Sequence, residues 1–386
     1  MKDFNGFIRP DGSVGIRNHV LVIPSVSCAN GVVGLIARMV PEAVPIYHGH
    51  GCGRAGKDME WHMRTLVNLG KNPNAAAVLV IGLGCEVIKG EFLAQGIASS
   101  GKPVELLNIQ EQGGSLKTAA RGAEIIRRFL DDAAREVRQP APFSSLTLGL
   151  ECGGSDAFSG VTANPSVGRV ADWVVDQGGT VILTETTEMI GTSHILERRA
   201  CDSQVAAQVA AMIAQAEKRT HELLGPLASV VIAPGNMDGG MSSIREKSLG
   251  CIIKGGSRVI NQVIDYAEIP SQKGLILMDG PGYDTESMAG VAAAGSQIMI
   301  FTTGRGNPIG FPMVPVIKVA STTQMFTRME DDMDINAGAI LQGRSLEQVA
   351  SDIRELLIKV AGGDLTKAER NQQTGILCMS TNLGAF

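Results

Sequence analysis

The chain alternates short, continuously apolar runs with longer segments of helical periodicity, and this pattern constrains its fold more than any other feature. The runs "HVLVIPSV" (19–26), "AAAVLVIGL" (75–83) and "TVILT" (180–184) lack the apolar–polar alternation of a strand with one exposed face. A strand that is apolar on both faces has to be covered on both, and helices cover parallel sheets in this way. The pattern therefore predicts an α/β protein with mainly parallel, doubly wound sheets.

The same pattern divides the chain into two domains. Further strands are expected at 103–109, 146–150, 229–234, 274–279 and 297–303, and long helices at 115–137, 203–223 and 345–361. The segment "PAPFSS" (140–145) has two prolines and no periodicity, which is typical of a linker. We therefore expect one domain over residues 1–139 and a second over 140–386, each within or somewhat above the usual range of about 100–200 residues.

The composition excludes several classes of function. A net charge of −5 and an aromatic content of 4% provide no basic or stacking surface for nucleic acid or anionic lipid. The N-terminal "MKDFNGFIRPDG" lacks the apolar core of a signal peptide, and no run approaches the roughly 18 apolar residues of a membrane span. Seven cysteines without framework spacing indicate a reducing compartment. We expect a cytoplasmic protein that binds neither membranes nor nucleic acid.

A glycine-rich polar loop follows nearly every apolar run. The segment "LECGGSDAFSGVTANP" (150–165) is an example, because it ends a predicted strand and then contains mostly small and polar residues. Ligands of open α/β sheets bind beyond the carboxyl ends of the strands. Ser155, Asp156 and Asn164 are therefore candidates for contact with a substrate.

Three cysteines share one local context. Cys52, Cys85 and Cys152 each lie beside glycine where a predicted strand becomes a loop. A thiolate is a soft ligand for iron, zinc or an iron–sulfur cluster, although a lone cysteine is often only a small buried apolar residue. Cys28 is a weaker fourth candidate, and the helical or terminal positions of the remaining cysteines predict structural roles: Cys201, Cys251 and Cys378.

Histidine and acidic residues add further candidates. His48 directly follows the predicted strand "VPIY" and is favoured over His50, because alternate residues of an extended segment face opposite sides. In "RMEDDMDINAG" (328–338), Asp332 and Asp334 are weaker metal candidates. Their spacing resembles the start of a calcium loop, but the glutamate expected near its twelfth position is absent. A solvated acidic turn is the alternative interpretation.

The segment "PGNMDGGMSSIREKSLG" (234–250) predicts a glycine loop and the start of a helix. Ser242 or Ser243 would cap this helix, with Glu246 near its third position. A helix N-terminus binds anions, and the basic residues Lys247 and Arg305 would add positive charge for a carboxylate or another oxyanion. The spacing matches neither common phosphate-binding glycine motif, so a nicotinamide dehydrogenase is not expected.

Several motifs together resemble the altronate/galactarate dehydratase family, which includes the large subunit of sulfolactate sulfo-lyase. They are "GFIRPDGSVGIRN", "GCG", "GLGCE", "CGGSDAFSGVTANP", "EKSLG", "DGPGYD", "FTTGRG" and "MEDDMDIN". The resemblance extends from Gly6 to about Lys367. It implies a smaller α/β dimerisation domain, a C-terminal Rossmann-like domain whose mainly parallel sheet has a crossover, and iron-dependent β-elimination from hydroxy acids.

The resemblance also implies partners. Fused dehydratases carry a small β-clip (SAF-type) domain before "GFIRPDG", which this chain lacks, so we expect that domain as a small subunit supplied in trans. A homodimer of large subunits and a small anionic hydroxy-acid substrate are expected as well.

The residue roles that follow from this resemblance are hypotheses. The iron ligands would be Cys52, Cys85 and Cys152, holding either mononuclear Fe(II) or a three-cysteine [4Fe–4S] cluster, and these two alternatives stay open. The catalytic residues would be Lys247, Glu185 and Glu188, one of them the base, with His48 nearby. The substrate-binding residues would be Ser155, Asp156, Asn164, Asn236, Asp284 and Arg305.

The identity of the leaving group is a separate question. We favour sulfite, with 3-sulfolactate converted to pyruvate, because the expected split into two subunits and the loop "PGNMDGG" depart from the dehydratase pattern, in which a lysine follows "PGN". Elimination of water from a sugar acid is the alternative. A third hypothesis, from a different functional class, is that the chain is a binding subunit without catalytic activity.

Overall fold

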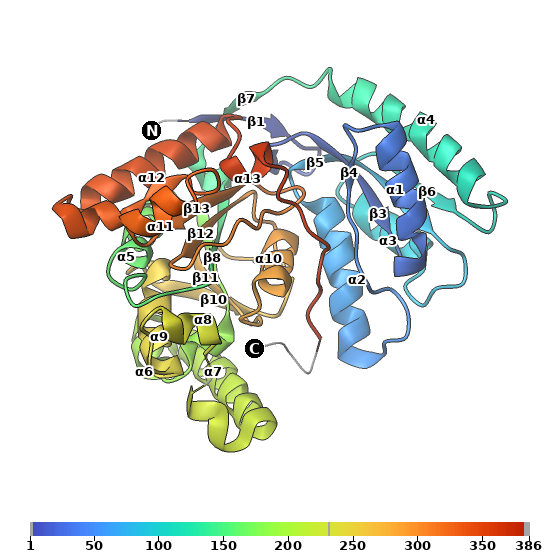
Figure 1. Ribbon diagram of the computed structural model, residues 1–386. Helices are drawn as coiled ribbons and strands as arrows, with labels where there is room; N and C mark the ends of the chain where they lie inside the picture. The colour runs from blue at the N-terminus through green and yellow to red at the C-terminus, as the bar shows by residue number, and fades with distance from the viewer. Residues whose placement is uncertain (1–2, 231, 382–386) are drawn as a thin grey trace.

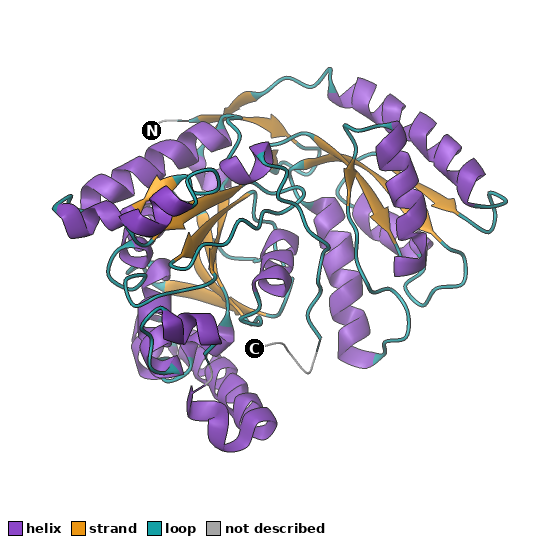
Figure 2. Ribbon diagram, in the orientation of Figure 1, coloured by secondary structure: helices purple, strands orange, loops and turns teal. Residues whose placement is uncertain are grey.

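A computed structural model describes residues 3–230 and 232–381 of the chain. They form two parallel sheets, each covered by helices, and a small antiparallel sheet at the junction between them (Figures 1 and 2). The antiparallel sheet has the order β2–β1–β7, from Val14–Gly15, Phe4–Ile8 and Gln139–Ala141. The α/β prediction is confirmed. The division of the chain at residues 139 and 140 stays a prediction.

The N-terminal sheet has the order β4–β3–β5–β6, and all its strands are parallel. The strands are β3 (His19–Pro24), β4 (Val44–Pro45), β5 (Ala75–Gly82) and β6 (Val104–Asn108). The helices are α1 (Asn30–Met39), α2 (Gly56–Lys71), α3 (Gly90–Ala98) and α4 (Ser115–Ala133). Helices α1 and α4 pack in one apolar cluster with one face of the sheet, and α2 and α3 pack in another with the opposite face. Every residue of β5 is therefore buried, as its apolar run predicts.

The C-terminal sheet has the order β10–β11–β9–β8–β12–β13–β14 and is parallel throughout. Its strands are β8 (Thr147–Cys152), β9 (Thr180–Leu183), β10 (Ile260–Ile264), β11 (Gly274–Met278), β12 (Ile298–Thr303), β13 (Val316–Ala320) and β14 (Ile335–Asn336). The strand order reverses between β8 and β12, and ligands of such sheets bind beyond the carboxyl ends of the strands at this switch point.

Helices cover both faces of this second sheet. The helices after β8 are α5 (Ala163–Asp176), α6 (Ser193–Leu196), α7 (Ser203–Leu224), α8 (Pro234–Asp238), α9 (Ile244–Cys251), α10 (Asp284–Ala293), α11 (Thr323–Arg328), α12 (Leu346–Ala361) and α13 (Lys367–Arg370). Helices α5 and α12 pack on one face, and α10 packs on the other. Because α10 also contacts α2, the two sheets share one apolar cluster.

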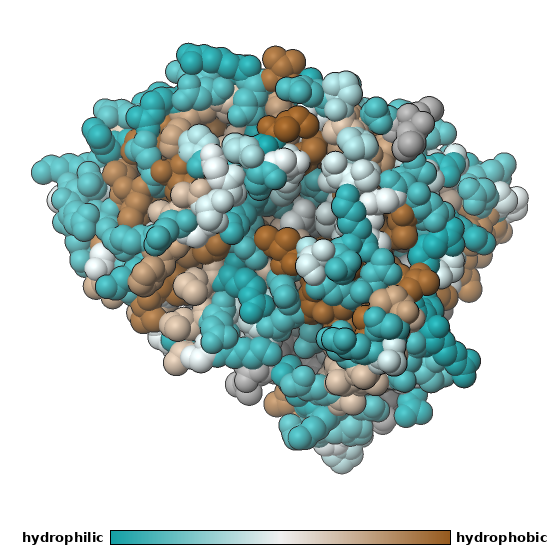
Figure 3. Space-filling view, turned by 180° about the vertical axis from the view of Figure 1, so that it is seen from behind, coloured by the Kyte–Doolittle hydropathy of each residue, from teal (hydrophilic) through white to brown (hydrophobic). Residues whose placement is uncertain are grey.

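The surface agrees with this layered arrangement. Seen from behind, hydrophilic side chains surround several smaller hydrophobic patches (Figure 3). Amphipathic helices that bury one face against a sheet leave such a mixed outer surface. No helix in the described ranges combines the length and the apolar character needed to cross a bilayer.

Most predicted elements are confirmed, and the exceptions have local causes. The strand expected at 229–234 is wrong: a 3-10 helix covers Gly225–Val230, α8 starts at Pro234, and residue 231 lies outside the described residues. Proline at the first position of a helix favours that helix over a strand. The expected linker 140–145 begins inside β7 and continues as a 3-10 helix over Phe143–Ser145.

Candidate metal and acid–base site

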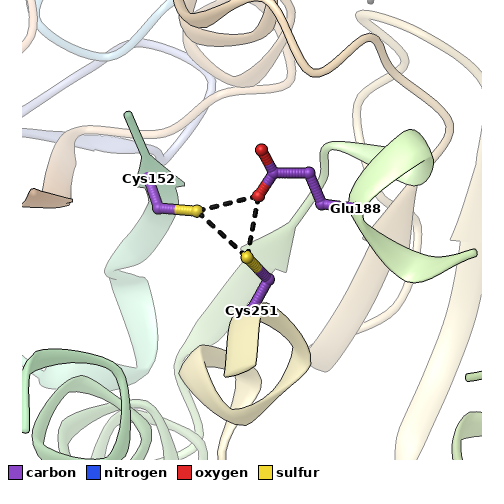
Figure 4. Close-up of side chains that lie close together, drawn as sticks. All are labelled: Cys152, Glu188 and Cys251. Atoms are coloured by element: carbon purple, nitrogen blue, oxygen red, sulfur yellow. Dashed lines mark hydrogen bonds between the residues drawn. The ribbon is translucent and has the colours of Figure 1, made fainter. Parts of the chain in front are cut away.

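Two thiols and one carboxylate meet beyond the end of strand β8 (Figure 4). Cys152 ends β8, Cys251 ends α9, and Glu188 lies in the 3-10 helix Thr186–Met189 that follows β9. Both Sγ atoms donate to Glu188 Oε2 at 2.9 Å, and the two Sγ atoms are 3.4 Å apart. All three side chains are buried.

The turn after β9 aims two glutamates at this group. Glu185 has a left-handed φ of 69°, which is uncommon for a residue other than glycine and typically costs of order 1–3 kcal/mol. Its Oε2 accepts hydrogen bonds from the Cys152 backbone N–H at 3.1 Å and from Lys254 Nζ at 2.5 Å. These contacts hold the turn in its strained conformation.

Helix α9 supplies the second thiol and a lysine. As predicted, Ser243 caps this helix, and its side chain accepts a hydrogen bond from the Glu246 N–H. Lys247 and Cys251 are four residues apart, so they lie on the same side of α9 and both contact Glu188. Lys254 follows in the 3-10 helix Ile252–Gly255 and completes a buried pair with Glu185.

The charges of the site are paired. Burial raises the pKa of Glu188, but Lys247, Lys254 and the two thiol hydrogen bonds outweigh burial, so its pKa is lowered overall. Burial lowers the pKa of Lys247, but the charges of Glu188 and the thiols raise it above its ordinary value. Lys254 behaves in the same way beside Cys152 and Glu185. Both lysines are therefore held in their charged form, which favours a charge-stabilising role for Lys247; its role as the base stays a prediction.

This donor set fits a soft or borderline metal ion. Thiolate ligands select iron, zinc or copper over calcium and magnesium, and a carboxylate completes common mixed sites. The hydrogen bond with Cys251 and burial raise the pKa of Cys152 well above its ordinary value, so metal binding would have to displace thiol protons. The two neighbouring lysine cations favour that loss. Cys152, Glu188 and Cys251 can thus bind a metal.

The structure does not gather the three cysteines expected from the sequence. Cys152 pairs with Cys251, whereas Cys52 and Cys85 are exposed in loops that follow strands of the N-terminal sheet. Cys85 Sγ accepts a hydrogen bond from Gln110 at 3.4 Å. The structural role expected for Cys251 is wrong in one respect: its helix places it in the buried thiol–carboxylate group, which its own sequence context does not indicate.

His48 lies apart from this group, in the N-terminal half of the chain. Its Nε2 donates to the Pro24 carbonyl at 2.7 Å, and its Nδ1 accepts from the His50 N–H at 3.2 Å. Burial lowers its pKa to about 4, so the ring is neutral. Both ring nitrogens of His48 are thus engaged with the protein backbone, and its catalytic role stays a prediction.

The polar residues around the glycine loop after β8 are mostly bound to protein. The Asp156 carboxylate accepts from Ser159 and Ser321, and the Asn164 side chain bonds both Thr302 and Gly250. These two side chains therefore shape the loop and have little capacity left for a substrate.

Two other residues of this region are less fully engaged. Asn236 donates to the Ser155 carbonyl at 2.8 Å, which ties α8 to the loop. The Ser155 hydroxyl is buried, and among the described residues it has no hydrogen-bond partner.

Arg305 and Asp284 lie close to the two glycines that follow β8. The Arg305 side chain is exposed in the loop after β12, and the backbone N–H of Arg305 donates to the Gly154 carbonyl at 2.7 Å. Asp284 starts α10 and accepts from Asn307 Nδ2 at 2.7 Å. Burial raises its pKa to about 6. Their substrate-binding roles stay a prediction.

The acidic segment 328–338 is tied to the protein backbone. Asp334 accepts from the backbone N–H groups of Lys318 and Lys367, at 2.8 and 3.1 Å. Asp332 is half-buried, and its carboxylate accepts a long contact from Asn371 Nδ2 at 3.4 Å. The segment does not take part in the metal-type group found among the described residues.

Sequence reasoning missed three charged residues. Lys254, Glu151 and Lys318 are buried, and the last two lie inside apolar strands. A charged residue within a continuously apolar run, as in "LTLGLEC" and "PVIKVAS", was a signal that could have indicated them. Lys254 carries no such signal, since it follows a short helix.

Two family models match the chain. The model described as "D-galactarate dehydratase/Altronate hydrolase, second domain" matches residues 6–134, and "D-galactarate/Altronate dehydratase, C-terminal" matches residues 143–383. The thiol–carboxylate group lies entirely within the second of these ranges.

Similar full-length proteins have two kinds of name. An altronate dehydratase of Bacillus subtilis is 35% identical over 96% of this chain and 76% of its own length. A galactarate dehydratase (L-threo-forming) of Escherichia coli is 35% identical over 93% of this chain and 73% of its own length. The (2R)-sulfolactate sulfo-lyase subunit beta of Chromohalobacter salexigens is 34% identical over 95% of both chains. With these models and relatives matching nearly its whole length, the chain belongs to the galactarate/altronate dehydratase family of lyases, which includes this sulfo-lyase subunit.

Proposed function

We propose that this protein is the large catalytic subunit of an iron-dependent lyase that eliminates a β-substituent from a 2-hydroxy carboxylate and yields a 2-keto acid. The observation that carries the proposal is the buried group of Cys152, Glu188 and Cys251, with Lys247 and Lys254 paired to its carboxylates. This group lies at the carboxyl edge of the sheet, where α/β proteins bind their ligands.

The three donor residues would hold the metal as a mononuclear site. The chemistry needs help because a C–H bond next to a carboxylate is very weakly acidic. A bound iron ion would supply Lewis-acid stabilisation of the negative charge that develops when this bond breaks. Two thiols and one carboxylate lack the third cysteine that a three-cysteine [4Fe–4S] cluster requires, which favours mononuclear Fe(II).

The chain's own residues would supply charge and orientation. Lys247 and Lys254 hold the pKa of Glu188 below its ordinary value, which keeps this carboxylate ionised, and both cations add positive potential where negative charge accumulates. The exposed guanidinium of Arg305 would bind the substrate carboxylate or sulfonate through paired hydrogen bonds, beside the bare backbone of Gly154.

We favour sulfite as the leaving group, with 3-sulfolactate as the substrate and pyruvate as the second product. The relative named as subunit beta of a sulfo-lyase supports this choice, since the match covers 95% of both chains. The name of this relative also implies a partner subunit. We propose that the partner of this chain is a small β-clip protein and that large subunits form a homodimer. Dehydration of a sugar acid is the second candidate, because dehydratases are equally similar in sequence.

The test is an anaerobic assay of the chain co-purified with a candidate small β-clip subunit, with Fe(II) supplied. Release of sulfite and pyruvate from 3-sulfolactate is expected. Formation of a deoxy-keto acid from altronate or galactarate, without sulfite release, would show that the activity is that of a dehydratase and not of a sulfo-lyase. Turnover of neither substrate class would overturn the lyase proposal.

A pair of cysteine variants tests the metal assignment. Cys251→Ser should lose bound iron and activity, whereas Cys201→Ser, which changes an exposed thiol outside the group, should keep both. Iron without acid-labile sulfide in the wild-type protein is the expected analytical result. Full iron content in Cys251→Ser contradicts the assignment.

A further inference from the structure

A lysine with no hydrogen-bond acceptor lies buried on the face of the sheet opposite to α5. Lys318 of β13 is fully buried, and among the described residues its Nζ has no hydrogen-bond partner. It is in register with Phe301 of β12, which is in register with Glu151 of β8. The three side chains therefore stand in one row across neighbouring strands, with Lys318 Nζ 3.4 Å from the centre of the Phe301 ring.

Acidic side chains surround Lys318, one within this row and three on neighbouring elements. Glu151 Oε1 accepts from Ser287 of α10 at 2.8 Å, while its Oε2 lacks a partner within the described part of the chain. The other acidic side chains whose charges act on Lys318 are Asp284 of α10 and, from the segment before β14, Asp332 and Asp334. Buried polar atoms are nearly always hydrogen-bonded, so an orphaned amine and an orphaned carboxyl oxygen on one row indicate a small polar ligand.

Lys318 differs from the two lysines that are paired with the glutamates of the thiol–carboxylate group. Lys247 and Lys254 each donate to a carboxylate and stay protonated. Burial lowers the pKa of Lys318 to about 7, because the acidic residues around it compensate only in part. A substantial fraction of Lys318 therefore carries a free lone pair at neutral pH, as a general base requires.

We propose that Lys318 is the catalytic base of the elimination and contacts the substrate at the carbon next to its carboxylate. This assignment rests on the proposed function. The Nζ lone pair takes the proton from this carbon, and the C–H electron pair becomes the new C=C bond. The β-substituent leaves with the electron pair of its bond to carbon.

The remaining steps restore the base and complete the product. The Lys318 ammonium returns its proton to the β-carbon as the enol becomes the keto acid, and the enol O–H proton passes to the solvent. The Phe301 ring lies against Nζ and stabilises the transient ammonium by a cation–π contact.

Variants of Lys318 and Lys102 test the assignment as a matched pair. Lys102 is also buried with its pKa lowered to about 7, but its Nζ donates to the carbonyls of Lys71 and Asn72 at the end of α2. Lys318→Met should lower kcat by about 10²–10⁴-fold at unchanged thermal stability, because it removes a base that makes no hydrogen bond. Lys318→Arg should be equally impaired, since a guanidinium does not lose its proton. Lys102→Met should lower Tm and keep the wild-type pH profile.

The pH profile separates catalysis from structure. Wild-type kcat/KM should fall as the pH drops below about 7, because Lys318 becomes protonated, and the residual activity of Lys318→Met should lack this limb. Should Lys318→Met fail to fold, Lys318→Gln, which stays polar but cannot act as a base, takes its place. A Lys318 variant within tenfold of wild-type kcat and with the same acidic limb overturns the assignment while the lyase function stands. If the wild-type protein is inactive on both substrate classes, the proposed lyase function and the assignment of Lys318 as its base are both wrong.

Discussion

At the scale of residues, the site depends on a carboxylate shared by several donors. Glu188 accepts from both thiols through one oxygen and pairs with Lys247 through the other. Each partner keeps the others in place, because a buried charge without a partner is strongly unfavourable. We therefore expect the loss of any one of these side chains to disturb the positions of the others.

We expect Glu188→Gln to damage both metal binding and stability. The change removes an ionised ligand and leaves the cation of Lys247 buried without its partner, which typically costs about 3–5 kcal/mol of unfolding free energy. Iron content by elemental analysis and denaturant unfolding measure the two effects. Glu222→Gln, on the exposed side of α7, is the control and should change neither. Wild-type iron content in Glu188→Gln would contradict the ligand role of Glu188.

A second residue-scale prediction concerns acid sensitivity. The folded-state pKa of His48 is lowered to about 4 by burial, against 6.5 as its ordinary value. Because this pKa is lowered by folding, the stability that neutral His48 contributes is complete above pH 6.5 and is lost as the pH falls toward 4, by up to about 1.4 kcal/mol per pH unit. His48→Gln, which keeps a donor for the Pro24 carbonyl, should show a shallower loss of unfolding free energy between pH 7 and pH 5. Equal slopes in the two proteins would refute this account.

At the scale of elements, strand ends and helix ends meet at the site. Strand β8 ends at Cys152, the turn after β9 aims the glutamates, and α9 presents Lys247 and Cys251 from one side. The order of the strands makes this possible, because β8 and β9 are neighbours in the sheet as well as in the chain. Positions far apart in the chain thus become neighbours at one edge.

We expect the cap of α9 to matter for the metal as well as for the helix. Ser243→Ala removes the acceptor of the Glu246 N–H and should cost about 1 kcal/mol of stability. It should also lower metal affinity several-fold, because the first turn of α9 positions Lys247. Ser345→Ala, which removes the equivalent cap of α12, should cost a similar amount of stability and leave metal affinity unchanged. Equal metal affinities in both variants, measured by competition with a chelator, would show that the α9 cap is only structural.

At the scale of the whole molecule, the two sheets form one packed unit. Trp61 and Leu66 of α2 share an apolar cluster with Met288 and Val291 of α10. Asparagine side chains reinforce the junction, and the C-terminal segment passes between the two halves (Figure 1), where the Leu377 N–H donates to the Tyr47 carbonyl. Because the two halves share an apolar core and hydrogen bonds, we expect them to unfold together.

We expect Asn74→Ala to destabilise the molecule as a unit. The Asn74 amide donates to the carbonyls of Gln297 and Met313, and its oxygen accepts from the Ile16 N–H, all within buried surroundings. Each buried group left without a partner costs about 1–3 kcal/mol. Calorimetry should show a single unfolding transition at lower temperature, whereas Asn5→Ala, at an exposed side chain, should leave it in place. Two separate transitions in the variant would contradict the coupling.

The sequence by itself determined the class of fold and the edge at which the chemistry lies. Apolar runs such as 75–83 and 180–184 had to be buried on both faces, and this requirement alone predicts parallel strands between helices. Glycine-rich loops after these runs indicated the carboxyl edge, and the residue types in and beside these loops pointed to Cys152, Glu185, Glu188 and Lys247. These signals are local, so a single sequence carries them.

Only the tertiary structure decided which of these residues meet. Cys152 and Cys251 are 99 positions apart, and no local pattern states that the end of α9 points a thiol at the end of β8. For the same reason Cys52 and Cys85, which have the more suggestive sequence context, lie in loops that follow strands of the other sheet. Lys318 needed the structure most, since an amine becomes a base only where neighbouring elements remove both its water and its hydrogen-bond partners.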